Sequence, residues 1–359
     1  MEDVVNPWLG RRVFLTGHTG FKGGWLSLWL AHRGAQTRGY ALAPATQPNL
    51  FTAASVAATV DDIRGDIRDY SKLEASITEF APEVVFHLAA QPLVRQSYAD
   101  PLGTYATNIM GTAHVLEAVR KTPSVRAVVC VTTDKCYQNQ EWLWPYRETD
   151  PLGGYDPYSS SKAGAEIVSA AYRSSYFPVD RLSEHHVCLA TARAGNVIGG
   201  GDWSEDRLIP DLIRGFQAKQ PVPIRRPAAI RPWQHVLDPL HGYIVLAEKL
   251  LAGHAQSATS YNFGPSDEDP WPVERIATKL ATMWGDGASW VGDSAPSVHE
   301  AHYLRLDASK ARAELEWKPR LEIERALEWT LNWYRSWQRG ADMQQETLAQ
   351  IIRFEQLAR

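Results

Sequence analysis

Apolar and polar positions alternate along the first half of the chain as short apolar runs between longer amphipathic segments. The short runs are bounded by turn-forming residues and predict buried strands at 11–17, 35–42, 59–67, 83–90, 125–133 and 185–197. The longer segments have helical spacing and predict helices at 21–34, 70–82, 100–121 and 158–176. Strands that alternate with helices indicate right-handed crossovers. We therefore predict an α/β protein with a doubly wound, Rossmann-like parallel sheet.

The pattern changes in the second half of the chain. Residues 198–210 are Gly-rich and residues 220–234 are rich in Pro and Arg. Helical spacing returns at 236–252, at 272–284 and near the C-terminus. We predict that residues 1–195 form the Rossmann domain, with 236–258 packing back on it. Residues 196–235 and 259–359 are then expected to form a smaller C-terminal α/β domain.

Composition narrows the class of protein. The 359 residues carry a net charge of −4, so an anionic ligand needs a local cluster of cations, and we expect neither a nucleic-acid nor a membrane partner. The three cysteines lack CxxC spacing and are predicted to be free thiols, as in a reducing compartment. No apolar run is long enough to span a bilayer and no signal-peptide pattern is present, so we expect a cytoplasmic protein. We expect no metal site.

Glycines at 17, 20 and 23 connect the first predicted strand to the first predicted helix. Gly17 permits a tight turn, Gly20 lets the backbone approach a pyrophosphate, and Gly23 lets the helix lie close to the sheet. The phosphates would then lie at the helix N-terminus. This context predicts a dinucleotide site. Lys22 in the same loop is suited equally to a phosphate and to solvent.

The second strand leaves the choice of dinucleotide open. No Asp or Glu occurs between Thr19 and Val60, so the acidic residue that usually binds a ribose 2′-hydroxyl is missing. Arg38, near the end of this strand, suits a 2′-phosphate instead. Asp66 follows the third strand, where it is suited to meet the adenine or to be an ordinary loop carboxylate. This region therefore does not decide between NAD and NADP.

Tyr158 and Lys162 lie four residues apart at the start of a predicted helix and share one face. An ammonium beside a phenol lowers the pKa of the phenol from about 10, because it favours the phenolate. A phenolate can take the proton of a sugar hydroxyl while hydride leaves the adjoining carbon. The YxxxK spacing is common by chance, but after a dinucleotide loop it indicates a dehydrogenase-type site.

The fifth predicted strand ends in Thr133, Asp134 and Lys135. Adjacent residues of an extended strand point to opposite faces, so a turn is needed to bring Asp134 and Lys135 to one site. At an isolated strand end such a pair is ordinarily a solvated ion pair. Beside Tyr158 and Lys162 it is a candidate acid and base.

These motifs together resemble the extended short-chain dehydrogenase/reductase family: TGHTGFKG near the N-terminus, HLAAQP after the fourth strand, a Thr at the end of the fifth, and YxxxK. The chain is more similar still to the nucleotide-sugar 4,6-dehydratases of this family, and among them to those that act on CDP-glucose. The stretches that carry this similarity are TTDKCYQNQEW, GGYDPYSSSK and RAGNVIGGGDW. The resemblance covers nearly the whole chain.

The resemblance implies NAD as a retained cofactor in the Rossmann domain and a nucleotide sugar in the smaller domain. It implies that Thr133 binds the sugar O4 beside Tyr158 and that Lys162 holds the nicotinamide ribose. The implied cofactor-binding residues are Gly17, Thr19, Gly20, Phe21, Lys22, Gly23, Asp66, Ile67, Leu88, Ala89, Ala90, Asn108, Tyr158 and Lys162. The implied substrate-binding residues are Gln91, Asn196, Arg207 and Arg231. Arg231 is expected on phosphate, whereas Arg225 and Arg226 are interpreted as solvated.

The implied reaction has three steps: oxidation at C4, elimination of water across C5 and C6, and return of the hydride to C6. By analogy, Asp134 is the acid and Lys135 the base of the middle step. This assignment needs a protonated Asp134 and a neutral Lys135, which a mutual ion pair would oppose. The dTDP-sugar relatives carry Glu at the position of Lys135.

We therefore expect a lyase that converts CDP-glucose to CDP-4-keto-6-deoxyglucose and water in deoxysugar biosynthesis, as a homodimer or homotetramer. A second interpretation is another nucleotide-sugar 4,6-dehydratase or a 4-epimerase. A third is a non-catalytic dinucleotide-binding sensor, against which the set Thr133, Tyr158 and Lys162 argues. The preference for cytosine rests on the resemblance alone.

Overall fold

A seven-stranded parallel sheet organises the computed structural model, which describes residues 6–266, 271–293 and 303–357. The strand order is β10-β6-β5-β4-β1-β2-β3. The strands are β1 (Arg12–Thr16), β2 (Gln36–Ala41), β3 (Asp61–Arg64), β4 (Val84–His87), β5 (Ala127–Val131), β6 (Cys188–Ala194) and β10 (Ser260–Phe263). The order reverses between β1 and β4, where doubly wound sheets bind ligands at the carboxyl ends of their strands. The predicted fold class is confirmed.

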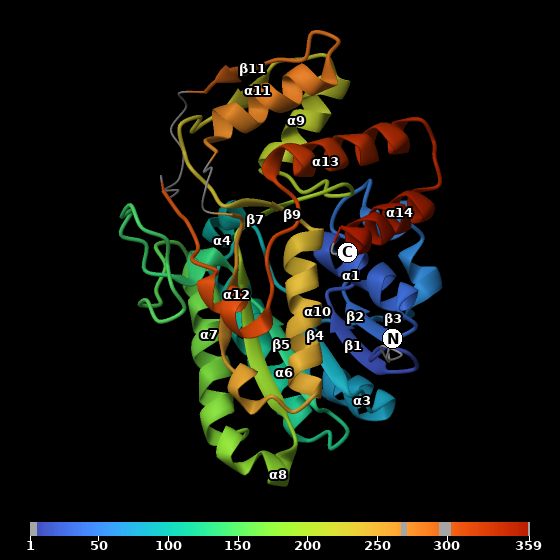
Figure 1. Cartoon of the computed structure of the whole chain (residues 1–359), viewed down its shortest axis with the longest axis vertical. Coiled ribbons are helices and arrows are strands. Elements are labelled where there is room, and N and C mark those ends of the chain that lie inside the picture. The colour runs from blue at the N-terminus through green and yellow to red at the C-terminus, as the bar shows by residue number, and fades with distance from the viewer. Residues whose placement is uncertain (1–5, 267–270, 294–302, 358–359) are drawn as a thin grey trace.

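Helices cover both faces of the sheet (Figure 1), because successive residues of each strand point to opposite sides. Val13 and Leu15 of β1 pack in one hydrophobic core, whereas Phe14 packs in a second core across the sheet. The first core includes α1 (Phe21–His32) and α10 (Leu237–Leu251). The second includes α3 (Tyr70–Phe80), α6 (Gly111–Arg120) and one face of α7 (Pro157–Ser175). The two cores hold the sheet rigid beneath the edge where the strands end.

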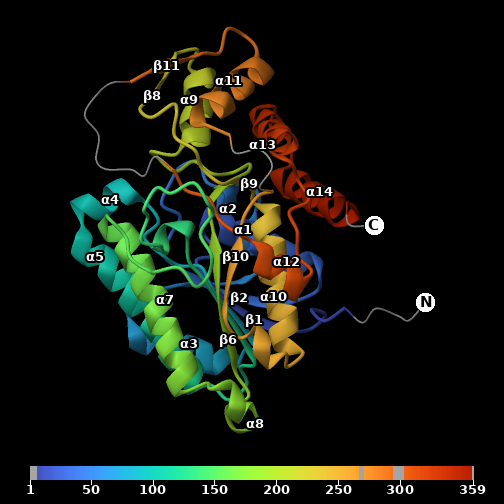
Figure 2. The ribbon, with the colours of Figure 1, turned by 60° about the vertical axis from the view of Figure 1, so that its left-hand side comes forward.

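The long helix predicted at 100–121 is interrupted. It consists of α5 (Pro101–Tyr105), a π-helical turn η2 (Ala106–Met110) and α6. Apolar spacing does not distinguish a π turn from an α turn, which is why the sequence missed it; such turns are frequent at functional sites. Together with α4 (Val94–Ala99), this segment packs against α7 (Figure 2).

A smaller group of elements lies beyond the carboxyl ends of the strands, at the top of Figure 1. It contains α9 (Leu208–Gln217), α11 (Val273–Trp284) and the paired strands β8 (Val222–Ile224) and β11 (Trp290–Gly292). A second pair, β7 (Asn196–Ile198) and β9 (Trp233–His235), lies between this group and the sheet. The remaining elements are α2 (Leu50–Ala53), η1 (Val56–Thr59), η3 (Asp134–Cys136), η4 (Val179–Arg181), α8 (Leu182–His185), η5 (Ala255–Ser257), α12 (Ser309–Leu315), α13 (Ile323–Gln338) and α14 (Met343–Gln356).

Strand β10 departs from the predicted division of the chain. It falls in the range 259–359 that was assigned to the smaller domain, yet it pairs with β6 as an edge of the large sheet. The prediction is wrong at this strand, because Tyr261 and Phe263 are fully buried and Phe263 packs edge-on against Tyr243 of α10. The division into two domains otherwise stays a prediction.

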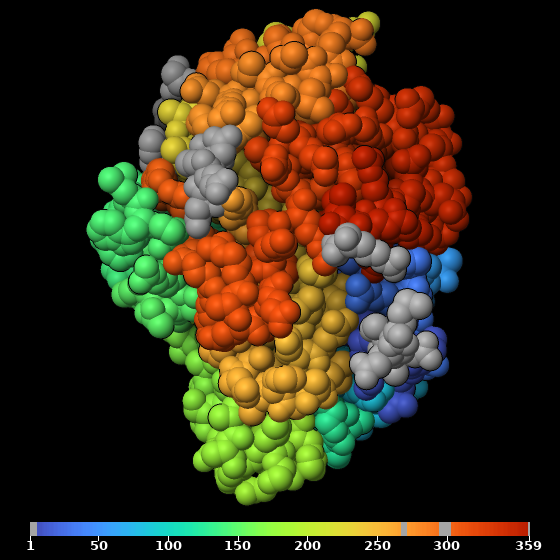
Figure 3. All heavy atoms as spheres, viewed as in Figure 1, coloured from blue at the N-terminus to red at the C-terminus, as the bar shows by residue number. Residues whose placement is uncertain are grey.

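The C-terminal helices return to the first half of the chain. On the face shown in Figure 3, their atoms lie against the N-terminal half and against the region around α11. Trp29 of α1 donates a hydrogen bond to Glu355 of α14 at 2.7 Å, and Arg33 forms an ion pair with the same carboxylate at 2.9 Å. Among the described residues, no helix is both long and apolar enough to cross a membrane.

Candidate active site

A cavity of about 1310 Å³ opens at the carboxyl ends of the central strands. Its wall combines the loops after β1, β4 and β5 with the start of α7 and residues of the smaller group of elements. This volume exceeds the roughly 300–1,000 Å³ typical of a pocket for one small molecule. All the predicted site residues line the cavity except Gln91 and Asn108.

The glycine-rich loop fits a dinucleotide. Gly17 has φ +81°, and a Cβ there would lie 2.8 Å from the backbone nitrogen of Ala89. A Cβ on Gly23 would lie 2.1 Å from the carbonyl oxygen of Gly17, so α1 packs closer than any other residue permits. Gly20 is the N-cap of α1, with no side-chain capping bond and no acidic residue in the first turn. The terminal N–H groups of the helix therefore face the cavity as donors for phosphate.

Hydrogen bonds to Thr16 and Asn108 fix the loop after β4. The N–H groups of Leu88 and Ala89 each donate to Oγ1 of Thr16 at 3.1 Å, which fixes the cavity-lining backbone. Asn108, in the π turn, accepts a hydrogen bond from the Gln91 N–H at 2.8 Å and donates to Ser161 of α7 at 2.8 Å. Asn108 therefore supports the wall instead of lining the cavity.

The side chain of Gln91 also points away from the cavity. Its amide nitrogen donates to Thr104 at 2.9 Å and its oxygen accepts from the Leu93 N–H at 2.6 Å. Sequence reasoning placed Gln91 correctly after β4, but spacing cannot show which way a loop side chain turns.

The ends of β2 and β3 border the other end of the cavity. Asp66 lines it and is paired with Arg68 at 2.6 Å; hydrogen bonds from Arg68 lower the pKa of Asp66. Arg38 pairs with Asp61 at 2.6 Å and is not part of the cavity wall. Arg38, the residue suited to a 2′-phosphate, is therefore engaged in an ion pair outside the cavity wall.

The Thr133–Lys135 segment forms the turn that the sequence required. Thr133 is the N-cap of the 3₁₀ turn η3, and its hydroxyl donates to Oδ1 of Asp134 at 2.9 Å. Asp134 is fully buried, and its Oδ2 has no hydrogen-bond partner among the described residues. Nζ of Lys135 lies 3.9 Å from Oδ1 of Asp134. Both side chains line the same cavity.

Helix α7 carries the Tyr–Lys pair into the cavity. Asp156 caps its first turn by accepting bonds from the N–H and the hydroxyl of Ser159, at 2.9 and 2.7 Å. The ammonium of Lys162 donates to the carbonyl of Val131 at 3.2 Å, and burial lowers the pKa of Lys162 to about 8.

The pKa of Tyr158 differs from the expectation. Burial raises it to about 12, although a hydrogen bond with Thr133 and the charge of Arg207 oppose this rise. Lys162 was expected to lower this pKa, but in the chain alone desolvation of the phenolate outweighs nearby positive charge.

Lys22, Arg207 and Lys162 lie near one another in the cavity wall. Burial, then Arg207 and Lys162, lower the pKa of Lys22 to about 7. Lys22 therefore lies near Lys162, Asp134 and Lys135 in the cavity, and its contact with a phosphate stays a prediction. Arg231 also lines the cavity, and the buried Oδ1 of Asn196 has no hydrogen-bond partner in the described part of the chain.

Sequence reasoning missed other cavity residues. Arg225 and Arg226, which were interpreted as solvated, also line the cavity. Asp206 pairs with both Arg225 and Arg95, each at 3.2 Å, and all three residues line the cavity. The Arg-rich stretch 225–231 was the signal for one side of this bridge, whereas nothing in the sequence around Arg95 indicated the other.

A parallel sheet with its switch point at a glycine-rich loop, and a Tyr–Lys pair facing that loop, define the extended short-chain dehydrogenase/reductase class. Within this class, the chain belongs to the GDP-mannose 4,6 dehydratase family, whose sequence model matches residues 14–330.

Individual relatives agree with this assignment. The chain is 55% identical to the CDP-glucose 4,6-dehydratase of Salmonella typhimurium over 94% of both chains. It is 28% identical to a dTDP-glucose 4,6-dehydratase of Xanthomonas campestris, over 91% of this chain and 94% of that protein. A solved dTDP-glucose 4,6-dehydratase from Bacillus anthracis superimposes with a TM-score of 0.76 at 22% identity, covering 93% of this chain and all of that one. A UDP-glucose 4-epimerase from Thermotoga maritima also gives 0.76 at 20% identity, over 91% and 99%. The two structures support the fold.

Proposed function

We propose that this chain is an NAD-dependent lyase that converts CDP-glucose to CDP-4-keto-6-deoxyglucose and water. The observation that carries the proposal is the turn η3, which presents Asp134 and Lys135 to the cavity that Tyr158 and Lys162 also line. A reaction that only oxidises C4 and reduces it again needs the Tyr–Lys pair alone. The additional pair of Asp134 and Lys135 therefore points to elimination of water. Identity of 55% to a CDP-glucose 4,6-dehydratase supports the substrate.

The cofactor would be held by the groups that fit a dinucleotide. The N-terminal N–H groups of α1 would bind the pyrophosphate, and Leu88 to Ala90 would line the nicotinamide side. The position of Arg38, outside the cavity wall, supports NAD over NADP. A dinucleotide held there would supply a hydride acceptor for C4 of the sugar and a hydride donor for C6.

Three residues would act at the C4 hydroxyl. Tyr158 takes the proton of this hydroxyl. Thr133, which is hydrogen-bonded to Tyr158, orients the sugar oxygen. Lys162 supplies positive charge beneath the phenol and a donor for ribose hydroxyls. The raised pKa of Tyr158 implies that the phenol becomes a base only in the loaded enzyme, where positive charge is added beside it.

The elimination step would use the pair on η3. The C4 ketone acidifies C5, so Lys135 in its neutral form takes the C5 proton while the C6 hydroxyl leaves. Asp134, in its protonated form, donates a proton to that hydroxyl, and water is released. As hydride reaches C6, the proton on Lys135 returns to C5, and the proton that Tyr158 took from the C4 hydroxyl restores the acid form of Asp134. The unpartnered Oδ2 of Asp134 is the atom available to the leaving hydroxyl.

The diphosphate of the substrate would meet Arg231, Arg207 and Lys22. Guanidinium groups offer paired donors to phosphate oxygens. In the loaded enzyme these three cations and Asn196 would fix the sugar against η3 and α7.

We propose that the protein forms a homodimer in the cytoplasm. The face formed by α5, the π turn and α7 exposes Leu102, Met110 and Ile167, which are 80%, 51% and 58% accessible. The same face of a second copy of the chain would bury these apolar side chains in a symmetric interface. The three free cysteines support the location.

A panel of nucleotide sugars tests the function. CDP-, dTDP-, UDP- and GDP-linked hexoses are incubated with the protein, with and without NAD, and the 4-keto-6-deoxy product is detected by its absorbance in alkali. We expect turnover of CDP-glucose. Preferred turnover of another nucleotide sugar, or a 4-epimer as the product, would contradict the proposal.

A further inference from the structure

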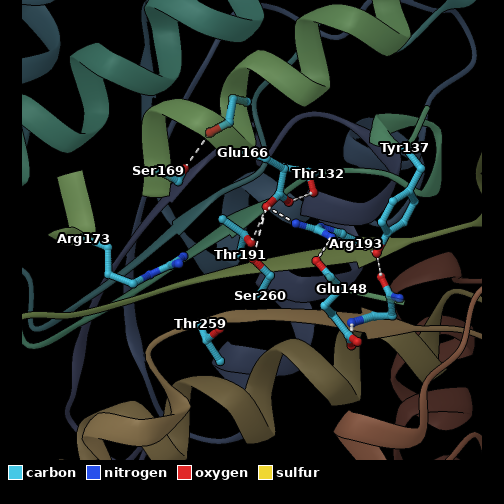
Figure 4. A network of polar contacts seen from close by, with 12 residues as sticks. Thr132, Tyr137, Glu148, Glu166, Ser169, Arg173, Thr191, Arg193, Thr259 and Ser260 are labelled. Atoms are coloured by element: carbon cyan, nitrogen blue, oxygen red, sulfur yellow. Dashed lines mark hydrogen bonds and ion pairs between the residues drawn. The ribbon is translucent and has the colours of Figure 1, made fainter. Parts of the chain in front are cut away.

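A buried ion pair joins α7 to β6 (Figure 4). Glu166 of α7 and Arg193 of β6 approach to 2.8 Å, with side chains 2% and 3% exposed. Glu166 follows Lys162 by one helical turn. Neither Glu166 nor Arg193 lines the cavity, so neither can touch a substrate.

The carboxylate of Glu166 binds the segment before η3. Its Oε1 accepts from the hydroxyl of Thr132 at 2.5 Å, and Thr132 immediately precedes Thr133. Its Oε2 accepts from Thr191 at 2.7 Å and from Arg193. Burial raises the pKa of Glu166, but Arg193 and the hydroxyls lower it by more, so the group stays a carboxylate. Glu166 therefore ties α7 to Thr132, which lies two residues before the first residue of η3.

Arg193 binds the segment after η3. Its Nη1 donates to the hydroxyl of Tyr137 at 2.8 Å and to the carbonyl of Glu148 at 3.1 Å. Tyr137 is the first residue beyond the turn, and its hydroxyl donates in turn to Asn262 of β10 at 2.7 Å. The ring of Tyr137 stacks on Tyr146 with 5.1 Å between centroids, which limits its movement.

We propose that the Glu166–Arg193 pair is a positioning device that fixes both ends of η3 relative to α7. Through it, Asp134 and Lys135 meet the same sugar as Tyr158 and Lys162. A buried ion pair by itself contributes little net stability, since desolvation offsets its attraction. The contacts to Thr132 and Tyr137 give the pair a geometric role. This inference rests on the proposed function of the two pairs it aligns.

Two mild substitutions release one end of the turn each. Thr132→Val removes the bond to Glu166. Tyr137→Phe removes the bond to Arg193, together with the bond to Asn262, and keeps the stacked ring. Both leave the ion pair itself in place, so they avoid the unpaired buried charge of Glu166→Gln. Ser169→Ala is the matched control, since Ser169 lies one turn further along α7 and donates to Ala165 of its own helix.

Hydrogen exchange, measured without substrate, tests the device independently of the reaction. We expect faster exchange in residues 132–137 of Thr132→Val and Tyr137→Phe than in the wild type or Ser169→Ala. Exchange at the wild-type rate in this segment would overturn the inference. So would acceleration spread evenly over the chain, because that reports a general loss of stability.

Turnover of CDP-glucose gives the second readout. A misplaced turn should lower kcat about tenfold or more with little change in KM. NADH should accumulate in a single turnover, because oxidation at C4 then outruns elimination. A lowered melting temperature with unchanged kcat and no NADH accumulation would overturn the positioning role. If the wild type does not turn over CDP-glucose, the proposed function fails, and hydrogen exchange alone decides on the device.

Discussion

At the residue scale, the side chain of Lys22 lies among the residues proposed to catalyse the reaction. It lies in the first turn of α1, yet its ammonium shares the cavity with Arg207, Lys162 and Lys135 around the buried Asp134. Burial, and then the neighbouring positive charge, favour the neutral form of Lys22, and the same positive charge attracts an anionic substrate. The sequence contained the lysine, but only the packing of α1 against the sheet determines where its side chain points.

Replacing Lys22 should change how stability depends on pH. The pKa of this lysine is 10.5 in the unfolded chain and about 7 in the folded chain. Between these values the unfolded state binds a proton that the folded state lacks, so the free energy of unfolding falls as pH is lowered from 10.5 to about 7. In Lys22→Met this loss is absent.

We therefore expect the melting temperature of ligand-free Lys22→Met minus that of the wild type to be highest near pH 7. This difference should decline as pH rises. Thermal scans across this range measure the difference, with Lys72→Met, at an exposed position of α3, as the control. A difference that does not vary with pH would mean that Lys22 has an ordinary pKa.

At the scale of elements, predictions from the sequence were most reliable where residues close together in the chain determine the structure. The glycine spacing and apolar pattern of α1 and the Tyr–Lys helix α7 required no information from distant residues. The π turn around Asn108 and the placement of β10 depend on contacts with residues far along the chain, Gln91 and Tyr243 among them. A four-residue strand carries too little pattern to show which sheet it joins.

Gly23→Ala tests the close approach of α1 to the loop. The added methyl would meet the Gly17 carbonyl, which is backbone and cannot move aside as a flexible side chain would. We expect a loss of stability of roughly 1–3 kcal/mol. NAD should also raise the melting temperature much less, because the helix N-terminus is displaced. Gly292→Ala is the control, since its methyl would enter open space. Equal NAD-induced shifts in the two variants would contradict this account of the loop.

At the scale of the molecule, the cavity joins parts that are distant in sequence. Residues near the N-terminus, on α7 and around Arg231 meet at one edge of the sheet. The sequence predicted most of these residues through motifs, but not the bridge of Arg95, Asp206 and Arg225, because ion pairs between helix α4 and two distant loops leave no periodic signal. The same parallel sheet and helices leave the apolar face of α5 and α7 exposed.

This face predicts the assembly state. Met110→Glu combined with Ile167→Glu should convert a dimer to a monomer, because a carboxylate cannot be buried there without a partner. Light scattering at several protein concentrations measures the mass. Leu9→Glu, at another exposed leucine outside these helices, is the control and should leave the mass unchanged. A dimer that survives the double substitution would exclude this face as the interface.

The central claim is that the turn after β5 performs the elimination, and Lys135→Ala tests it most directly. The variant and Lys72→Ala are incubated with CDP-glucose and NAD in D₂O, and NADH, 4-keto-6-deoxy product and deuterium at C5 are measured together. We expect NADH to form in Lys135→Ala while product and C5 deuterium fall about 100-fold or more. Lys72→Ala should match the wild type. Dehydration by Lys135→Ala at the wild-type rate would remove Lys135 from the mechanism.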